Sequence, residues 1–317
     1  MANPTGTGTV WNLPNYSGEL FTADATQTPF LSMIGGLTGG KRTDNFEFPT
    51  CQLYSNPEAS QPAITETAST TAPAAFALER TQEKNVCQIH QEVIDLTYAK
   101  MSNSGRLSGI ATAGAAANPT NEKDWQIQQR LIKIARDVEF SFLQGNYQIS
   151  TGAAVANKTR GMIELCSTGN TVDAKAAALS KAMINELLRT MADNGALFRN
   201  MVIYAGAAVK QALSEIYAST AGFAQPASRN VGGVNITDIE TDFCKMGVVW
   251  DRFMPAGTLL VADLSVCAPV FQEVPGKGIL FEEPLAKVGA SDRVQIYGQI
   301  GLDHGPQFAH GTITGIA

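Results

Sequence analysis

The sequence has 317 residues and a formal net charge of −6, because 29 Asp and Glu outnumber 23 Lys and Arg. Charged residues make up 16% of the chain. This is below the ~25% of an ordinary soluble protein, so we expect other molecules, such as further copies of the chain, to cover much of the surface. The acidic balance argues against a dedicated nucleic-acid binder. No apolar run reaches the ~18 residues of a membrane span, and we expect no secretory signal at the N-terminus.

The five cysteines, Cys51, Cys87, Cys166, Cys244 and Cys267, are odd in number and form no CxxC pair. This spacing argues against a disulfide framework or a structural zinc site and favours a reducing compartment. We therefore expect five free thiols that are buried or half-buried.

Residues 1–40 are rich in Gly, Pro, Asn and Thr and show little helical periodicity. Their scattered apolar side chains, including Phe21 and Phe30, are too few to form a core by themselves. We predict an arm that lies on a larger body or on a neighbouring chain.

Residues 41–100 have the pattern of a long two-stranded element. Phe46 and Phe48 alternate with polar residues, as in a half-buried strand. Pro49 cannot donate a ladder hydrogen bond, so it indicates an edge position or a bulge.

The returning strand of this element is predicted at residues 85–98. Its apolar residues change parity near Val93 and Ile94, where we expect the buried face to switch. At ~3.3 Å per residue such a run spans roughly 46 Å, so we expect it to project from the body. Residues 58–77 show no helical or strand periodicity and predict a long loop between the two strands.

The strongest predicted helix covers residues 122–144 and follows a linker-like stretch at 109–119. Its apolar residues recur at helical spacing; they include Ile127, Leu131, Ile134, Val138 and Phe142. Gly145 is predicted to end the helix.

The remainder of the chain alternates helices with short strands. The predicted elements are helices at 176–194 and 207–217 and strands at 201–205, 235–240, 247–253, 258–262, 279–282, 293–302 and 308–316. The buried face of the first of these helices is expected to consist of Ile184, Leu187, Leu188 and Met191. The order indicates an α+β fold with mostly antiparallel strands.

The sequence contains no nucleotide-binding loop, nucleophile elbow or zinc-protease motif. Asp303, His304 and His310 are the best candidates for a metal or catalytic cluster. A strand would separate residues six apart by ~20 Å, so we favour surface or interface histidines. His90 is likewise expected to face solvent or an interface. We predict no catalytic, cofactor or metal site.

Charged residues also gather at three places without forming a catalytic pattern. We interpret the carboxylates at 282–283 and 238–242 as solvated faces. The predicted helix at 122–144 interleaves its basic residues with acidic ones, which favours ion pairs with neighbours over phosphate binding.

The order of these pieces resembles the major capsid proteins of tailed phages, which have the Hong Kong 97-type (HK-97-like) fold, and in particular their SU-10-like branch. The stretches that carry the resemblance are 16–21 (YSGELF), 28–31 (TPFL), 87–89 (CQI), 128–139, 292–298 (DRVQIYG) and Gly311. The resemblance extends over essentially the whole chain.

The resemblance implies a division of the chain into the parts of that fold. These are an N-terminal arm at 1–40, an extended β-hairpin loop at 41–100, a peripheral domain at 101–180 with the spine helix at about 122–144, an axial domain at 181–265, and late strands at 266–317 that return to the peripheral domain. The extended loop would lie across the adjacent subunit.

The implied function is structural. Many copies would assemble as hexamers and pentamers into an icosahedral head around double-stranded DNA, with the DNA in loose contact only. Separate scaffolding, portal and decoration proteins are possible partners, and assembly would take place in the host bacterial cytoplasm. We expect inter-subunit contacts at Phe21, Phe30, Phe46, Phe48, Tyr54, Phe76, Ile89 and His90.

Some members of the fold link subunits through an isopeptide bond between a loop Lys and an Asn. No Lys lies between Arg42 and Glu83, while Lys41 and Lys84 flank the predicted hairpin at its base. We therefore predict no such crosslink.

Three other functions remain open at this point. The first is an encapsulin-like shell that stores an enzyme cargo, and the second is another virion structural protein, such as a tail or decoration component. The third is an enzyme built around Asp303, His304 and His310.

Overall fold

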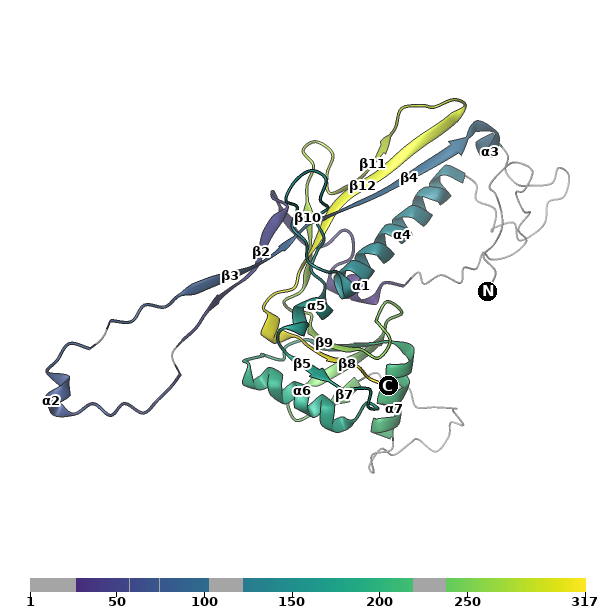
Figure 1. Cartoon of the computed structure of the whole chain (residues 1–317). Helices are drawn as coiled ribbons and strands as arrows, with labels where there is room; N and C mark the ends of the chain where they lie inside the picture. Colours follow the sequence, from purple (N-terminus) through teal and green to yellow (C-terminus); the bar gives the residue numbers. More distant parts are fainter. Residues whose placement is uncertain (1–26, 57, 74, 103–121, 219–237) are drawn as a thin grey trace.

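The computed structural model describes residues 27–56, 58–73, 75–102, 122–218 and 238–317. Two β-sheets with adjoining helices form the body, and a two-stranded hairpin projects from it (Figure 1). Phe21 and the linker-like stretch at 109–119 lie outside the described residues. None of the helices in the described parts combines the length and apolarity that a membrane crossing needs.

The first sheet is organised around one long strand, β12 (Ser291–Asp303). Along one edge β12 pairs antiparallel with β10 (Ala268–Gln272) and β11 (Leu280–Pro284), and along the other with β4 (Gln88–Thr97). β1 (Lys41–Thr43) adds to β10 in parallel. The β4–β12 register runs from Ser291 opposite Thr97 to Ile300 opposite Gln88.

The spine helix α4 (Glu122–Gln144) lies along the β4–β12 ribbon (Figure 1). Its bounds are those expected from the apolar spacing. Burial is uneven, because Ile134, Val138 and Phe142 are fully buried while Ile127 and Leu131 are only half-buried. The C-terminal half of the helix is therefore the part that joins the core.

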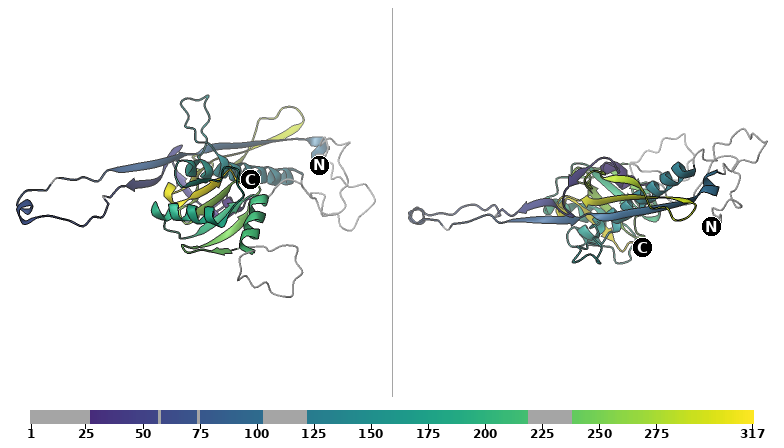
Figure 2. Two further views of the ribbon diagram at one scale, coloured as in Figure 1. Left: turned by 60° about the horizontal axis from the view of Figure 1, so that its bottom comes forward. Right: turned by 90° about the horizontal axis from the view of Figure 1, so that it is seen from above.

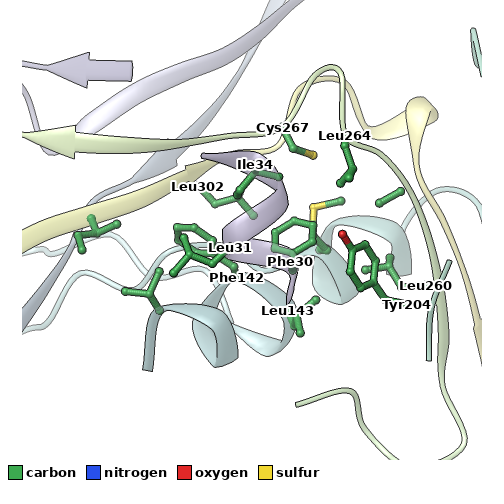
Figure 3. Packing of buried hydrophobic residues seen from close by; sticks show 14 of the residues in the cluster. Phe30, Leu31, Ile34, Phe142, Leu143, Tyr204, Leu260, Leu264, Cys267 and Leu302 are labelled. Atoms are coloured by element: carbon green, nitrogen blue, oxygen red, sulfur yellow. The ribbon is translucent and has the colours of Figure 1, made fainter. Parts of the chain in front are cut away.

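A short helix from the arm completes this core. α1 (Pro29–Ile34) was not expected from the sequence, and it places Phe30 and Leu31 at 0% and 1% exposure. Figure 3 shows Phe30 between the rings of Phe142 and Tyr204, with centroid distances of 6.5 and 5.3 Å in edge-on geometry. The end of the arm thus packs on the body of its own subunit.

The second sheet has the order β5 (Thr171–Asp173), β13 (Gly311–Thr314), β9 (Leu259–Asp263), β6 (Met201–Ala205), β8 (Lys245–Trp250) and β7 (Asp238–Glu240). β6 is buried on both faces, since Val202 and Tyr204 enter the core around α1 and α4, whereas Ile203 enters a second core. The alternation of one strand therefore holds two cores together.

The second core contains the helices α6 (Lys181–Asp193) and α7 (Ala207–Ala218). The four residues expected on the buried face of α6, namely Ile184, Leu187, Leu188 and Met191, are all buried. Ser180 caps α6 by accepting a hydrogen bond from the Met183 N–H, and the helix starts there rather than at residue 176. The remaining helices are α3 (Tyr98–Ser102), α5 (Met162–Ser167) and the 3₁₀ turn η3 (Gln307–Ala309).

The projecting hairpin consists of β2 (Glu47–Tyr54) and β3 (Arg80–Val86), joined by a loop that holds the one-turn helix α2 (Glu66–Ser69). The register shifts between Pro49 and Cys51, which confirms the predicted bulge. The further views show the loop extending well away from both sheets (Figure 2).

The predicted switch of the buried face near Val93 and Ile94 is wrong. Every second residue of β4 faces inward throughout, so Val93 is exposed and Ile94 is buried. The change of environment falls at Cys87, whose N–H donates to the Phe46 carbonyl before β4 begins its pairing with β12. The chain leaves the hairpin for the main sheet at this residue.

The base of the hairpin crosses β12 at a glycine. A Cβ at Gly301 would lie 2.8 Å from both the Phe48 ring and the Val86 carbonyl oxygen. Phe48 is itself buried against Cys87 and Val270. The missing side chain of Gly301 therefore allows the hairpin to sit on the main sheet at this point.

We expect Gly301→Ala to lower the free energy of unfolding by about 1–3 kcal/mol, because the new methyl group meets backbone as well as a packed ring. Denaturant unfolding measures the change. The control is Gly152→Ala, where a Cβ meets nothing within 4 Å, and this variant should unfold like the parent chain. Equal stability of the two variants would contradict the close approach at Gly301.

Candidate functional site

The candidate histidine cluster lies where the chain passes from β12 to β13. The His310 Nδ1 accepts a hydrogen bond from the Asp263 N–H at 3.2 Å, and its Nε2 lies 2.7 Å from the His304 carbonyl oxygen. These partners require a neutral ring with the proton on Nε2. Burial agrees with this state, because it lowers the pKa of His310 to about 4.

His304 is also enclosed. Its Nδ1 lies 2.7 Å from the Gly305 carbonyl oxygen, and burial lowers the pKa of the ring. His304 and His310 both have 0% exposure, so the expectation of surface or interface histidines is wrong. The reason is topological, because the segment that carries them connects the first sheet to the second, and His310 accepts the N–H of Asp263 at the end of β9.

The carboxylates near these histidines hold backbone and loops. Asp263 accepts from the N–H groups of Arg199, Asn200 and Ser265. Asp303 accepts from the Gly305 N–H and pairs with Lys41. In the described part of the chain, no group of three or more His, Cys, Asp or Glu side chains is arranged to hold a metal ion. The cluster therefore ties the two sheets together and shows no reactive geometry.

The charged residues expected to form ion pairs do so, mostly with the sheet. Lys133 lies 2.5 Å from Glu92 on β4 and 2.7 Å from Asp137 on α4, and Arg130 reaches the same Glu92 at 3.2 Å. The 282–283 carboxylates are paired as well, Glu282 with Lys123 and Glu283 with Lys277. These groups fasten α4 to the ribbon and brace β11.

The projecting hairpin carries the exposed apolar groups of interest. Its loop exposes Ile64 at 72%, Phe76 at 70% and Leu78 at 51%, while Tyr54 at the end of β2 is 64% exposed. The helix α2 buries no residue. Large apolar side chains that the subunit leaves uncovered are typical of surfaces that another molecule covers.

The structure separates the eight residues expected at subunit contacts. Phe46, Tyr54, Phe76 and Ile89 are exposed and stay candidates. Phe30, Phe48 and His90 are instead buried inside their own subunit, Phe30 in the main core, Phe48 at the hairpin base and His90 on the inward face of β4. Because these three side chains are already covered, the subunit does not offer them as free contact surface.

A groove between β4 and α4 has a mostly polar and charged lining that includes two exposed apolar side chains. It has a volume of about 510 Å³ and is lined by residues that include Ile89, Phe140, Lys133, Asp137 and Lys158. Ile89 is 50% and Phe140 is 49% exposed. Phe140, Ile64 and Leu78 were not predicted as contact residues from the sequence. For Phe140, the available signal was an aromatic residue that lies off the apolar stripe of the helix.

A comparison with protein families accounts for this combination of a packed body and an uncovered hairpin. A family model described as SU10 major capsid protein matches residues 3–317. The chain belongs to the SU10 major capsid protein family. A search of curated proteins gave no match.

Solved structures agree on the fold. The capsid of cyanophage A-1(L) is 11% identical, with 95% of this chain and 96% of that chain covered and a TM-score of 0.70. The capsid of a native GTA particle is 12% identical, with 96% of this chain and 95% of that chain covered and a TM-score of 0.61. The SrpI encapsulin complex of Synechococcus elongatus PCC 7942 is 11% identical, with 93% of this chain and 92% of that chain covered and a TM-score of 0.53. The chain has the HK-97-like α+β capsid fold.

The family and the fold establish the role of this major capsid protein. It is a structural component of the virion, and its shell is built from many copies of itself. The encapsulin is a relative in fold only. The surfaces that matter for function are therefore those that meet other copies, and the buried histidines maintain the subunit.

The low pKa of His310 predicts a loss of stability in acid. Its ring stays neutral in the folded subunit down to about pH 4, while an unfolded imidazole takes a proton near its ordinary pKa of ~6.5. The unfolded state therefore binds more protons between these values, and the free energy of unfolding falls as the pH falls through this window.

Over that pH window we expect the free energy of unfolding to fall by about 3 kcal/mol less in His310→Gln than in the parent. At neutral pH the variant is less stable than the parent. Denaturant unfolding at several pH values measures the difference, in which titrating groups that do not interact with His310 cancel. Parallel pH profiles for the two proteins would contradict a neutral buried His310.

Proposed function

We propose that this capsid protein forms the icosahedral head of a tailed phage, with hexamers and pentamers that enclose double-stranded DNA. The observation that carries the proposal is the hairpin of β2 and β3. It projects from the body of the subunit, and its loop leaves large apolar side chains uncovered. A subunit of this shape buries its hairpin only against a neighbour. Repeating one head-to-tail contact around an axis closes a ring.

The hairpin loop would lie across the adjacent subunit. Its apolar residues Ile64, Phe76 and Leu78 supply one side of the contact. On the neighbour, the exposed side chains of Ile89 and Phe140 in the otherwise polar groove between β4 and α4 would supply the other side. Burial of each large side chain contributes about 1.5–3 kcal/mol, so a few such residues suffice to bias assembly.

The proposal also covers the contact with DNA, the compartment of assembly and the other proteins of the particle. The net charge of −6 suits a wall that holds dense DNA in loose contact, because fixed cationic sites would bind it tightly. Five free thiols suit assembly in the reducing cytoplasm of a host bacterium. Scaffolding, portal and decoration proteins are expected as separate chains. We assign the protein no catalytic activity, since the histidines and carboxylates of the best candidate cluster hold backbone groups.

An encapsulin-like container is the alternative function from the sequence analysis, and the similarity to SrpI concerns the fold alone. The two functions differ in their contents, which are DNA for a phage head and a protein cargo for an encapsulin. Nuclease-protected DNA in purified particles supports the first, and a co-purifying enzyme without DNA supports the second.

The hairpin contact is tested by the triple variant Ile64→Ser, Phe76→Ser and Leu78→Ser. We expect its free energy of unfolding to stay within about 0.5 kcal/mol of the parent, because these side chains are exposed in the subunit. The protein concentration needed for assembly should rise at least about 100-fold. Light scattering and negative-stain electron microscopy measure assembly.

The matched control is Gln61→Ser, Thr67→Ser and Thr71→Ser in the same loop, which removes no large apolar side chain and should assemble like the parent. Parental assembly by the apolar triple variant would refute the contact.

The particles should dissociate into single chains on a denaturing gel. Lys41 and Lys84 lie at the base of the hairpin, where they pair with Asp303 and Glu47, and no Lys lies between residues 42 and 83. A ladder of covalent oligomers would overturn this prediction.

A further inference from the structure

The N-terminus of α1 is capped by a residue far away in sequence. Thr28 occupies the cap position but makes no side-chain cap hydrogen bond. Instead the two carboxyl oxygens of Glu139, on α4, accept from the N–H groups of Phe30 and Leu31 at 2.8 and 2.7 Å. Glu139 is 0% exposed. A single buried carboxyl group thus fastens the arm to the spine helix.

A second buried carboxyl group faces the first. Asp251 follows β8, is 1% exposed and lies in hydrogen-bonding range of Glu139. Its Oδ1 accepts from the Phe253 N–H at 2.8 Å, and its own N–H donates to Ala205 at the end of β6. Its Oδ2 has no donor in the structure. Two ionised carboxylates in this position would repel each other without solvent.

One proton between the two groups removes this conflict. The shared proton lies between Asp251 Oδ2 and a carboxyl oxygen of Glu139, and Glu139 keeps both of its bonds to α1. The orphaned oxygen then has a partner. Burial raises the pKa of both groups, that of Glu139 to about 8, and the proton belongs to the pair.

The other groups around the pair do not supply a substitute charge. From β6, Tyr204 faces both carboxyls and stays neutral because burial raises its pKa. Cys267 lies near that tyrosine, and burial raises the pKa of its thiol too. α1 contributes no titratable side chain. On α4 the charged residues within one turn are Arg136 and Asp137, and Asp137 pairs with Lys133. Arg252, next to Asp251 in the chain, lies over the Trp250 ring. Neither arginine is among the groups that chiefly shift the pKa of Glu139 or Asp251.

We propose that Glu139 and Asp251 share one proton and act as a pH-sensitive latch that holds the arm helix α1 to the spine helix and to the connection after β8. The latch is closed while the proton is bound. Loss of the proton leaves two adjacent buried negative charges, and opening α1 relieves their repulsion. The device belongs to the single subunit and does not depend on what the shell encloses.

The direction of the pH effect follows from linkage. In the open state the two acids titrate near their ordinary pKa of ~4, so opening releases a proton over the range in which the closed pair still holds it. The opening equilibrium should therefore rise about tenfold per pH unit and level off above about pH 8.

Hydrogen exchange of the Phe30 and Leu31 amides in the unassembled full chain measures this opening, after division by the intrinsic exchange rate at each pH. We expect the rise in the parent chain and a flat profile in Asp251→Asn, whose amide donates to Glu139 without titrating. Asp238→Asn, an exposed carboxylate on β7, is the matched control and should keep the parental profile. A parental slope in Asp251→Asn, or a flat profile in Asp238→Asn, would overturn the latch.

A measurement on the unchanged chain covers the case in which Asp251→Asn fails to fold. Infrared spectroscopy at neutral pH should show the C=O stretching band of a protonated carboxylic acid, which disappears as the pH rises above about 8. The absence of this band at neutral pH would contradict the shared proton.

Discussion

The antiparallel pairing of β4 with β12 is the interaction on which the rest of the subunit depends. One face of this ribbon receives α4, whose buried residues Ile134, Val138 and Phe142 define the main core. The hairpin precedes β4 in the chain, and its base fits over Gly301 of β12. The histidine segment follows β12 and leads to β13 of the second sheet. A shift of one residue in the β4–β12 register would turn every inward side chain outward, so this pairing fixes the hairpin, the spine helix and the second sheet relative to one another.

The hairpin is a different case, because it is ordered by pairing but not by a core. Its strands satisfy each other's backbone groups, while its loop leaves Ile64 and Phe76 in solvent. A single subunit gains nothing from these apolar groups, and a shell gains their burial at every contact. This division explains why one chain serves both as a stable body and as a component that needs copies of itself.

Much of this architecture could be predicted from the sequence. The apolar repeat from Ile127 to Phe142 fixed the bounds of α4, and Pro49 marked the bulge in the hairpin. The short element α1 could not be predicted, because its capping group is Glu139, more than a hundred residues away. β1 and β5 have only three residues each, which is too short for periodicity to show.

The candidate site shows the same limit. Exposure of Phe76 and Ile89 was expected, whereas the burial of Phe30, Phe48, His304 and His310 was not. Each of these four lies at a crossing between elements distant in sequence, and a local pattern contains no information on such crossings. The Glu139–Asp251 pair is of this kind too, since its two carboxyl groups come from α4 and from the end of β8.

A cryo-electron microscopy reconstruction of particles assembled from the full chain tests the central claim most directly. The account predicts closed shells in which residues 55–79 of each subunit lie on an adjacent subunit and cover Ile64, Phe76 and Leu78. Tubes or separate rings, or shells in which this loop contacts no other chain, would contradict it.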